Sequence, residues 1–449
     1  MTFLNTSLIR KLTLFLAPVM LSVSAMAADF NQVQRSAIQG DSTAQFNLGA
    51  MYYEGDGVRQ DYSKAMEWYT KAAIQGDSTA QFNLGAMYNN GDGVRQDYSK
   101  AMEWYTKAAN QGDADAQFNL GVIYDNGDGV RQDYSKAMEW YTKAAIQGDS
   151  TAQYNLGLMY YEGEGVPQDY ATARQWFEKA ANQGNSDAQL TLGVMYSVGE
   201  GVRQDYSKAA QWAEKAASQD YANAQAMLGA MYYEGDGVPQ NYSKAAQWLE
   251  KAASQDYADA QFRLGWMYFN GEGVRQDYAT ARQWIEKAAI QGDADAQYGI
   301  GWMYYEGEGV PQDYATARQW FEKAANQGNS DAQFRLGWIY EKGQGVRQDY
   351  AKALEWTQKA ANQGDSTAQF NLGVMYYQGL TVPQDYTKAR QWYEKAANQG
   401  NASAQFNLGL MYQDSKGLPQ NMTIAKEWFG KACDNGDQNG CDAYRNLNQ

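Results

Sequence analysis

The sequence DSTAQFNLGAMYYEGDGVRQDYSKAMEWYTKAAIQG (residues 41–76) returns almost unchanged in the next 36 residues, 77–112. A Leu-Gly pair, first seen at Leu48 and Gly49, recurs at this period through the chain, with Ile300 replacing the leucine once. Eleven copies follow one another without an insertion. A fixed period of this length is typical of repeat proteins, in which each unit stacks on its neighbours.

Within each copy the pattern predicts two helices separated by a loop. The first helix presents one face at the i, i+3, i+4, i+7 spacing, formed by Gln45, Leu48, Gly49 and Tyr52. Gly49 costs roughly 1 kcal/mol inside a helix, which is acceptable where the partner helix must approach closely. The glycines within residues 54–57 end this helix.

The second helix carries large aromatic side chains and alanines. Asp61 provides its N-cap, and Gly76 ends it. We expect Trp68 and Tyr69 to pack toward the next copy, while the alanines let the helices cross closely. One such pair cannot bury its apolar face alone, so stacked copies must share a continuous core. The sequence therefore predicts an all-α fold: an α/α solenoid superhelix of eleven 36-residue helix-turn-helix repeats with terminal caps.

The repeated pattern A-x-F-x-L-G-x-x-Y-x-x-G-x-G-V-x-x-D-Y-x-K-A-x-x-W-Y-x-K-A-A-x-x-G resembles the Sel1-like repeat family. That family is related to the tetratricopeptide repeats, whose helix pairs have 34 residues, and the longer loop here favours the Sel1-like branch. The resemblance covers essentially the whole mature chain. It implies a right-handed α/α superhelix that acts as an adaptor or scaffold for other macromolecules. In bacteria such proteins are often exported, and some serve envelope assembly or host interaction.

Residues 1–27 are typical of a secretory signal peptide. Arg10 and Lys11 precede an apolar run over residues 12–23, and Ala25-Met26-Ala27 matches an A-x-A cleavage site. We expect a mature chain that begins at Ala28 and is periplasmic or secreted; an uncleaved anchor is the alternative. The rest of the sequence contains no segment long and apolar enough to predict a membrane span.

The formal net charge of the whole chain is −15, and removal of Arg10 and Lys11 with the signal peptide makes it −17. An acidic chain without a basic stripe is a poor match for nucleic acid or anionic lipid. Soluble cationic partners remain compatible with this charge, although the acidic residues are spread through every loop. We expect the mature chain to be a monomer.

The two ends depart from the repeat. Residues 28–40 keep the phase of a second helix without its aromatic residues and predict an N-terminal half-repeat cap. The eleven repeats then span residues 41–436, and residues 437–449 predict a C-terminal capping helix.

Cys433 and Cys441 replace an alanine and a glutamine of the earlier copies. Their positions lie on neighbouring antiparallel helices across a short turn, which allows a disulfide. The spacing of eight also resembles the cysteine-rich Sel1-like proteins, which carry such a pair in every unit. A bridge here would hold the last repeat, which lacks a neighbour, and fits an oxidising compartment. Two free thiols or half of a metal site are the alternatives.

The residue types argue against catalysis. The chain has no histidine, which removes the usual general base and the usual zinc ligand, and it has no S-x-x-K or Walker-type motif. The repeated G-[DE]-G-V-x-Q-D loop lacks the alternating oxygen ligands of a calcium loop. Some cysteine-rich relatives have been described as β-lactamases or penicillin binders, so a weak activity of this kind is one alternative. We expect a non-enzymatic protein without a metal or cofactor.

Information about a ligand should lie where the copies differ. By resemblance to tetratricopeptide arrays, the first-helix positions that line the concave surface are Asn47, Ala50, Tyr53 and Glu54. The residue after the Leu-Gly pair is small or aliphatic in eight copies, and in three consecutive copies it is tryptophan. We call these three residues, Trp266, Trp302 and Trp338, the tryptophan row.

Arginine and further aromatic residues accompany the tryptophan row. The residue three before each tryptophan is Arg263, Gly299 or Arg335, one helical turn away. Phe269 and Tyr305 flank the row. Tryptophan with arginine is the composition of binding hot spots, and the same rings could stack on sugars. Indoles that only fill space between helices are the alternative.

A second recurring residue is an asparagine at Asn47, Asn83, Asn119 and Asn155. A row of amides offers donors and acceptors to an extended peptide, but replicated polar surface is an equally good interpretation. The sequence thus favours a scaffold that binds a protein or peptide partner. An envelope protein that binds carbohydrate or peptidoglycan is the alternative.

Overall fold

The computed structural model describes residues 30–379 and 382–447. These residues form 24 helices and no strand, so the predicted all-α fold is confirmed for the described part of the chain. The predicted signal peptide, residues 1–27, lies outside it. The chain divides into two compact units, one of residues up to Met231 with Gly235–Pro239, the other of Tyr232–Glu234 with residues from Gln240 on.

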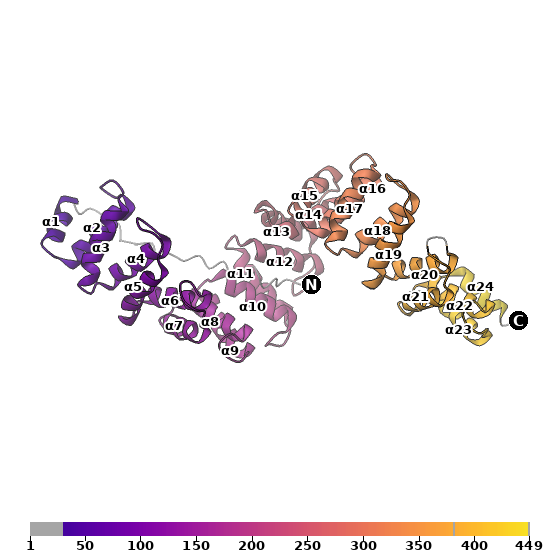
Figure 1. Cartoon of the computed structure of the whole chain (residues 1–449), viewed down its shortest axis with the longest axis horizontal. Helices are drawn as coiled ribbons and strands as arrows, with labels where there is room; N and C mark the ends of the chain where they lie inside the picture. Colours follow the sequence, from indigo (N-terminus) through magenta and orange to yellow (C-terminus); the bar gives the residue numbers. More distant parts are fainter. Residues whose placement is uncertain (1–29, 380–381, 448–449) are drawn as a thin grey trace. The chain divides into compact units, whose positions relative to one another are not determined.

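The helices follow the repeat in chain order (Figure 1). The first unit contains α1 (Phe30–Ile38), α2 (Ser42–Glu54), α3 (Tyr62–Ile74), α4 (Ser78–Asn90), α5 (Tyr98–Asn110), α6 (Ala114–Asn126), α7 (Tyr134–Ile146), α8 (Ser150–Glu162), α9 (Tyr170–Asn182), α10 (Ser186–Val198) and α11 (Tyr206–Ala217). The division falls within α12 (Ala222–Glu234). The second unit contains α13 (Tyr242–Ser254), α14 (Ala258–Asn270), α15 (Tyr278–Ile290), α16 (Ala294–Glu306), α17 (Tyr314–Asn326), α18 (Ser330–Lys342), α19 (Tyr350–Asn362), α20 (Ser366–Gln378), α21 (Tyr386–Asn398), α22 (Ala402–Asp414), α23 (Met422–Asp434) and α24 (Gln438–Asn446).

Repeat 1 consists of α2 and α3, repeat 2 of α4 and α5, and so on to α22 and α23 in repeat 11. Inside each unit the two helices of a repeat pack against each other, and the second helix packs against the first helix of the next repeat. This nearest-neighbour packing is solenoid-like, as the fixed period predicts.

The helix ends are set by the residues that the sequence singles out. An Asp41 carboxylate oxygen accepts a hydrogen bond from the Ala44 amide at 2.6 Å, and Asp61 accepts one from the Lys64 amide at 3.1 Å. Both are N-caps that satisfy otherwise unpaired amides. Gly55 ends α2 with a φ of 79°, a left-handed conformation that favours glycine. The predicted caps are therefore confirmed in repeat 1.

Gly49 is required by a close contact within its own repeat. A Cβ atom at this position would lie 2.6 Å from Cδ1 of the Tyr69 ring, far inside van der Waals contact. Tyr69 is only 2% exposed and belongs to a core cluster that also contains Leu84 of repeat 2. The expected close approach at Gly49 is confirmed, and Tyr69 reaches the next repeat as expected.

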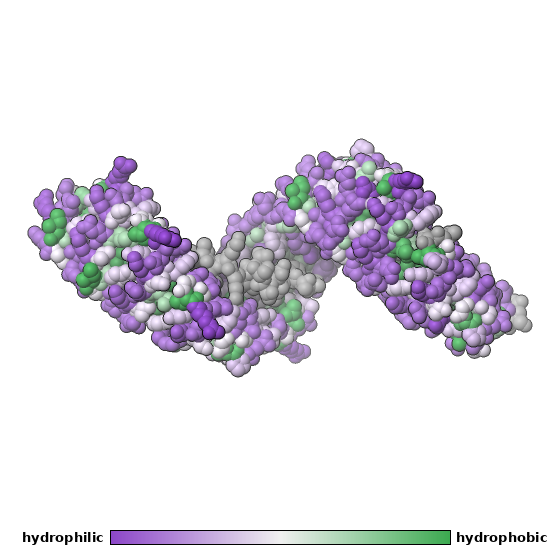
Figure 2. Space-filling model, in the orientation of Figure 1, coloured by the Kyte–Doolittle hydropathy of each residue, from purple (hydrophilic) through white to green (hydrophobic). Residues whose placement is uncertain are grey.

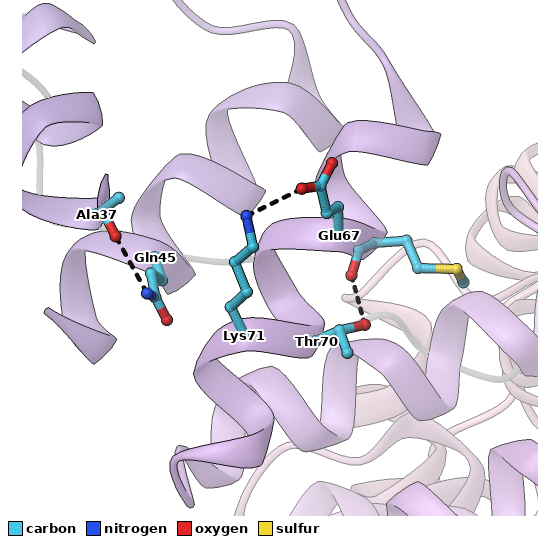
Figure 3. Close-up of polar contacts among 6 residues, drawn as sticks. Ala37, Gln45, Glu67, Thr70 and Lys71 are labelled. Carbon is cyan, nitrogen blue, oxygen red and sulfur yellow. Dashed lines mark hydrogen bonds and ion pairs between the residues drawn. The ribbon is translucent and has the colours of Figure 1, made fainter. Parts of the chain in front are cut away.

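One buried glutamine in the first helix of each repeat connects successive second helices. Gln45 Nε2 donates to the carbonyl oxygen of Ala37 at 3.1 Å (Figure 3), and Gln75 Nε2 donates to Gln45 Oε1 at 2.8 Å. The same pair of contacts recurs in most other repeats, and in repeat 11 Asn435 replaces the second glutamine. Each buried amide is thus paired at both its ends, which a buried polar group needs.

The chain ends carry short helices. In α1, Ala37 is buried and Phe30 packs edge-to-face on Tyr52 with ring centroids 5.9 Å apart. At the other end, Cys433 of α23 and Cys441 of α24 form the predicted disulfide, with a Cα–Cα distance of 4.4 Å. The bridge links the last repeat to the helix that follows it. Helices of the described part of the chain are too short and too polar to span a membrane.

Candidate functional site

Eleven of the fourteen tryptophans share one structural role. They occupy the position of Trp68 on the second helix of each repeat. A lysine three residues later, such as Lys71 of repeat 1, places its Nζ over each of these rings at 3.7–4.3 Å from the centroid. Lys71 also pairs with Glu67 at 2.9 Å, next to the Thr70 hydroxyl that donates to a backbone carbonyl (Figure 3). Each of these indoles is therefore covered within its own helix.

The three remaining tryptophans form the tryptophan row on α14, α16 and α18. Trp266 is 38% exposed and Trp338 is 37% exposed, while Trp302 is half-buried. The equivalent residues Ala86 and Val122 of the first unit are buried. Ala50 is also buried, in a core cluster with residues of repeat 2, so its assignment to an open surface was wrong. At this position the rings of Trp266 and Trp338 are exposed, whereas smaller side chains are buried between the helices.

Trp266 lies flat against a neighbouring ring. Its indole stacks on Phe269 with centroids 5.1 Å apart and an interplanar angle of 6°. Arg263 does not lie over this pair; its Nε is held by both carboxylate oxygens of Asp259, at 2.9 and 3.0 Å. The exposed ring system is thus a flat aromatic surface bordered by a fixed ion pair.

Trp302 is covered by an arginine from the following repeat. It stacks on Tyr305 with centroids 6.1 Å apart, and Cζ of Arg335 lies 4.3 Å from the Trp302 ring centroid. Tyr305 is buried, and its hydroxyl donates to Gln344 Oε1 at 3.0 Å. Arg335 therefore acts across a repeat boundary rather than beside Trp338 of its own helix.

Trp338 has a different cation. Lys342, one turn further along α18, places Nζ 4.6 Å from the Trp338 ring centroid. Its ring still remains more than a third exposed. The three indoles share a position but have three different surroundings.

The asparagine row lies mostly inside the repeat packing. Asn83, Asn119 and Asn155 are buried, and Asn47 is half-buried. Asn119 Nδ2 donates to the Asp115 backbone carbonyl at 2.8 Å. Burial raises the pKa of Tyr69, and its side-chain hydrogen bond with Asn83 opposes this rise. These amides contact the preceding repeat or their own helix, so we leave them out of the candidate surface.

Sequence reasoning missed three aspartates that accompany the tryptophan row. Asp259, Asp295 and Asp331 each stand seven residues before a tryptophan, at two turns along the same helix face. Burial and the Asp365 carboxylate raise the pKa of Asp331, while the charge of Arg335 lowers it. The available signal was that aspartate stands at this repeat position in all three of these consecutive repeats, as it also does at Asp115 and Asp187.

Within residues 30–379 and 382–447, no group of three or more His, Cys, Asp or Glu side chains could hold a metal ion. On the face seen in Figure 2, hydrophilic residues predominate and apolar residues form small separate patches. The arrangement of the tryptophan row suits recognition through flat rings and charge.

Comparisons with known proteins converge on one family. The Sel1 repeat model matches eleven times without a gap, from residues 42–77 to residues 402–437. A crystal structure of a protective antigen present in uropathogenic Escherichia coli strains, which displays an SLR fold, has 39% identity and a TM-score of 0.85. That match covers 94% of this chain and 90% of the antigen.

A second solved structure, a Sel1 repeat protein from Oxalobacter formigenes, has 39% identity and a TM-score of 0.56. The match covers 69% of this chain and 90% of that protein. No protein among the curated sequences matches the chain.

Proposed function

The chain belongs to the Sel1 repeat family, and we propose that it is a non-enzymatic scaffold that binds a protein or peptide partner through the tryptophan row. The exposure of Trp266 and Trp338 carries this proposal. In a repeat protein, side chains shared by all copies build the packing. A large residue that occurs in only three adjacent copies, and is exposed in two of them, is therefore not needed for that packing.

The surroundings of the row match the composition of protein-binding hot spots. Tryptophan, tyrosine and arginine dominate the binding energy at such surfaces. Trp266 with Phe269 and Trp302 with Tyr305 form two stacked aromatic pairs on the first helices of adjacent repeats. A rigid aromatic surface loses little conformational entropy on binding, which favours affinity.

A glycan of the cell envelope is the second candidate. It is favoured by the flat, exposed stack of Trp266 on Phe269, because sugar rings bind to flat aromatic faces. The two candidates differ in the probes that the tryptophan row should bind.

The test is selection from a random 12-residue peptide library against the full chain. The first variant combines Trp266→Ala, Trp302→Ala and Trp338→Ala. The matched control combines Ile38→Ala, Ile74→Ala and Ile146→Ala, which shorten side chains that are 68–74% exposed and stand outside the three repeats that carry the row. We expect selected peptides to bind the control like the wild type and to lose at least about tenfold in affinity for the tryptophan variant.

Two results would contradict this function. Selected peptides that bind the tryptophan variant unchanged would show that the row is not the binding surface. Saturable binding of peptidoglycan fragments that requires the row, without any peptide selection, would favour the glycan candidate.

We also propose that the protein works in the periplasm or outside the cell. The A-x-A motif at residues 25–27 and the bridge between Cys433 and Cys441 support this, since disulfides persist in oxidising compartments. N-terminal sequencing of the protein from a periplasmic fraction should start at Ala28. An intact Met1 on cytoplasmic protein would contradict this location.

A further inference from the structure

Arg335 occupies a defined position between two repeats. Its guanidinium lies 4.3 Å from the Trp302 ring centroid and 5.9 Å from that of Tyr305. Burial raises the pKa of Asp331, one turn before Arg335 on α18, and the charge of Arg335 opposes this rise. Burial raises the pKa of Tyr298, and the same guanidinium opposes that rise. An arginine side chain thus lies over a stacked aromatic pair, one helical turn from a carboxylate.

One repeat earlier the same surroundings are present without the arginine. Trp266 and Phe269 take the places of Trp302 and Tyr305, and Asp295 takes the place of Asp331. Gly299 stands where Arg335 stands in the next repeat. It has no side chain to extend over Trp266, whose ring is 38% exposed, whereas Trp302 under its arginine is half-buried.

The charge balance at this position favours a cation. Asp295 is exposed, and its Oδ1 accepts a hydrogen bond from Asn329 Nδ2 at 2.8 Å. Burial raises the pKa of Asp293, and the nearby Asp295 and Asp259 carboxylates raise it further. Arg263, the nearest arginine along α14, is already bound by Asp259.

We propose that Trp266, Phe269 and Asp295 form a subsite for the guanidinium group of an arginine side chain from a bound peptide. The inference rests on the proposed function and specifies one chemical feature of the partner. The partner's guanidinium stacks on the exposed indole as Arg335 stacks on Trp302, and Asp295 supplies the opposite charge.

Arginine fits these surroundings better than lysine does. A planar guanidinium can stack on an aromatic face and hydrogen bond to a carboxylate at its edge, whereas an ammonium acts as a point charge. Repeat 9 shows the lysine form, in which Lys342 covers Trp338 from its own helix. Gly299 leaves room for the planar group to arrive from outside.

The test uses the full chain labelled with 5-fluorotryptophan and followed by ¹⁹F NMR. The Trp266 signal is assigned from its loss in Trp266→Phe. The probes are N-acetyl-argininamide and its neutral isostere N-acetyl-citrullinamide. We expect the arginine probe to shift the Trp266 signal saturably, and the citrulline probe to bind at least roughly fivefold more weakly.

Two variants test the surroundings. Gly299→Arg should place an internal guanidinium over Trp266 and abolish the shift by the arginine probe. Its Cβ would lie 3.3 Å from Ile285 Cγ2 and 3.4 Å from Phe262 Cε2, which requires only small adjustments. Asp295→Asn should weaken the arginine probe roughly two- to fivefold. The matched control, Asp187→Asn, replaces an exposed aspartate at the same repeat position and should leave the affinity for the arginine probe unchanged.

Equal binding of both probes, or unchanged affinity in Asp295→Asn, would overturn the subsite. If Gly299→Arg fails to fold, as judged by circular dichroism, Asp295→Asn and the citrulline probe decide the question. Peptides that require the tryptophan row but show no arginine preference would contradict this inference alone. Binding of the arginine probe at Trp266 by a chain that selects no peptide would contradict the proposed function alone.

Discussion

Repeats 2–4 and repeats 7–9 have the same pair of helices but differ in the residue that follows the Leu-Gly pair. The residue after the Leu-Gly pair is 3% exposed as Ala86 and 1% exposed as Val122, but 38% exposed as Trp266. Three residues earlier, Asn119 is buried, whereas Arg335 is half-buried and reaches over an indole of the preceding repeat. The position after the Leu-Gly pair is therefore closed by small residues in repeats 2 and 3, the closed region, and carries an exposed ring at Trp266 of repeats 7–9, the open region.

The largest expected effect comes from moving tryptophan into the closed region. In Ala86→Trp the indole must enter a site where the alanine is buried, and overpacking of this kind should lower the free energy of unfolding by about 3 kcal/mol. Urea unfolding followed by circular dichroism measures the loss. Ile146→Trp, at a side chain 73% exposed, is the control and should change little. Wild-type stability in Ala86→Trp would remove the distinction between the regions.

Within the open region, substitution of Trp302 and substitution of Trp266 should differ in their effect on stability. Trp302 packs against the core cluster of repeats 8–10 and lies under Arg335, so Trp302→Ala should cost about 2 kcal/mol of stability. Trp266→Ala, at a more exposed ring, should cost less than about 1 kcal/mol and still weaken peptide binding. Parallel urea titrations and peptide titrations give both quantities. A larger loss of stability in Trp266→Ala would assign that indole to the core.

The buried asparagines offer a third comparison. Asn119 Oδ1 is buried and has no hydrogen-bond partner among the described residues. Asn119→Leu should therefore raise the free energy of unfolding by about 1 kcal/mol, because an unsatisfied polar atom is removed. The half-buried Asn371 occupies the same position in repeat 10, and Asn371→Leu should change little. A loss of peptide binding in Asn119→Leu would return this row to the candidate surface.

The smallest effect concerns charge. Burial raises the pKa of Asp113 above its ordinary 3.8, so its ionised form destabilises the folded state near neutral pH. Asp113→Asn should raise the free energy of unfolding at pH 7. This gain in stability should vanish below about pH 3.8, where the aspartate is protonated in both the folded and the unfolded state. The cap survives, since Asn185 accepts from Ala188 at 2.8 Å just as Asp113 accepts from Ala116.

Asp331→Asn in the open region should gain less, because the positive charge of Arg335 already opposes the rise in the pKa of Asp331. Thermal unfolding of both variants from pH 3.5 to pH 7 checks the sign. A gain for Asp113→Asn that grows as the pH falls would contradict the assigned cause.

The sequence predicted the structural features that recur in every repeat. Glycine at the position of Gly49 in all eleven copies identifies a close contact. Nine aspartates and two asparagines at the position of Asp61 identify a cap, because both residue types accept hydrogen bonds at helix N-termini. The exposure of single side chains was harder to predict. Ala50 and Trp266 occupy the same repeat position, and only the size of the side chain decides whether it is buried between the helices. The contact of Arg335 with Trp302 depends on how neighbouring repeats stack, which no single repeat encodes.

The lysine-covered indoles have an optical consequence. Eleven of the fourteen tryptophans share nearly the same neighbours and should emit in nearly the same way, whatever is bound to repeats 7–9. Bulk intrinsic fluorescence is therefore dominated by a constant background, and a ligand on the tryptophan row would alter only a minor part of the emission. Replacement of the lysine-covered tryptophans, such as Trp68, by phenylalanine would make the tryptophan row the main source of emission, so that the intrinsic fluorescence would report a ligand bound there.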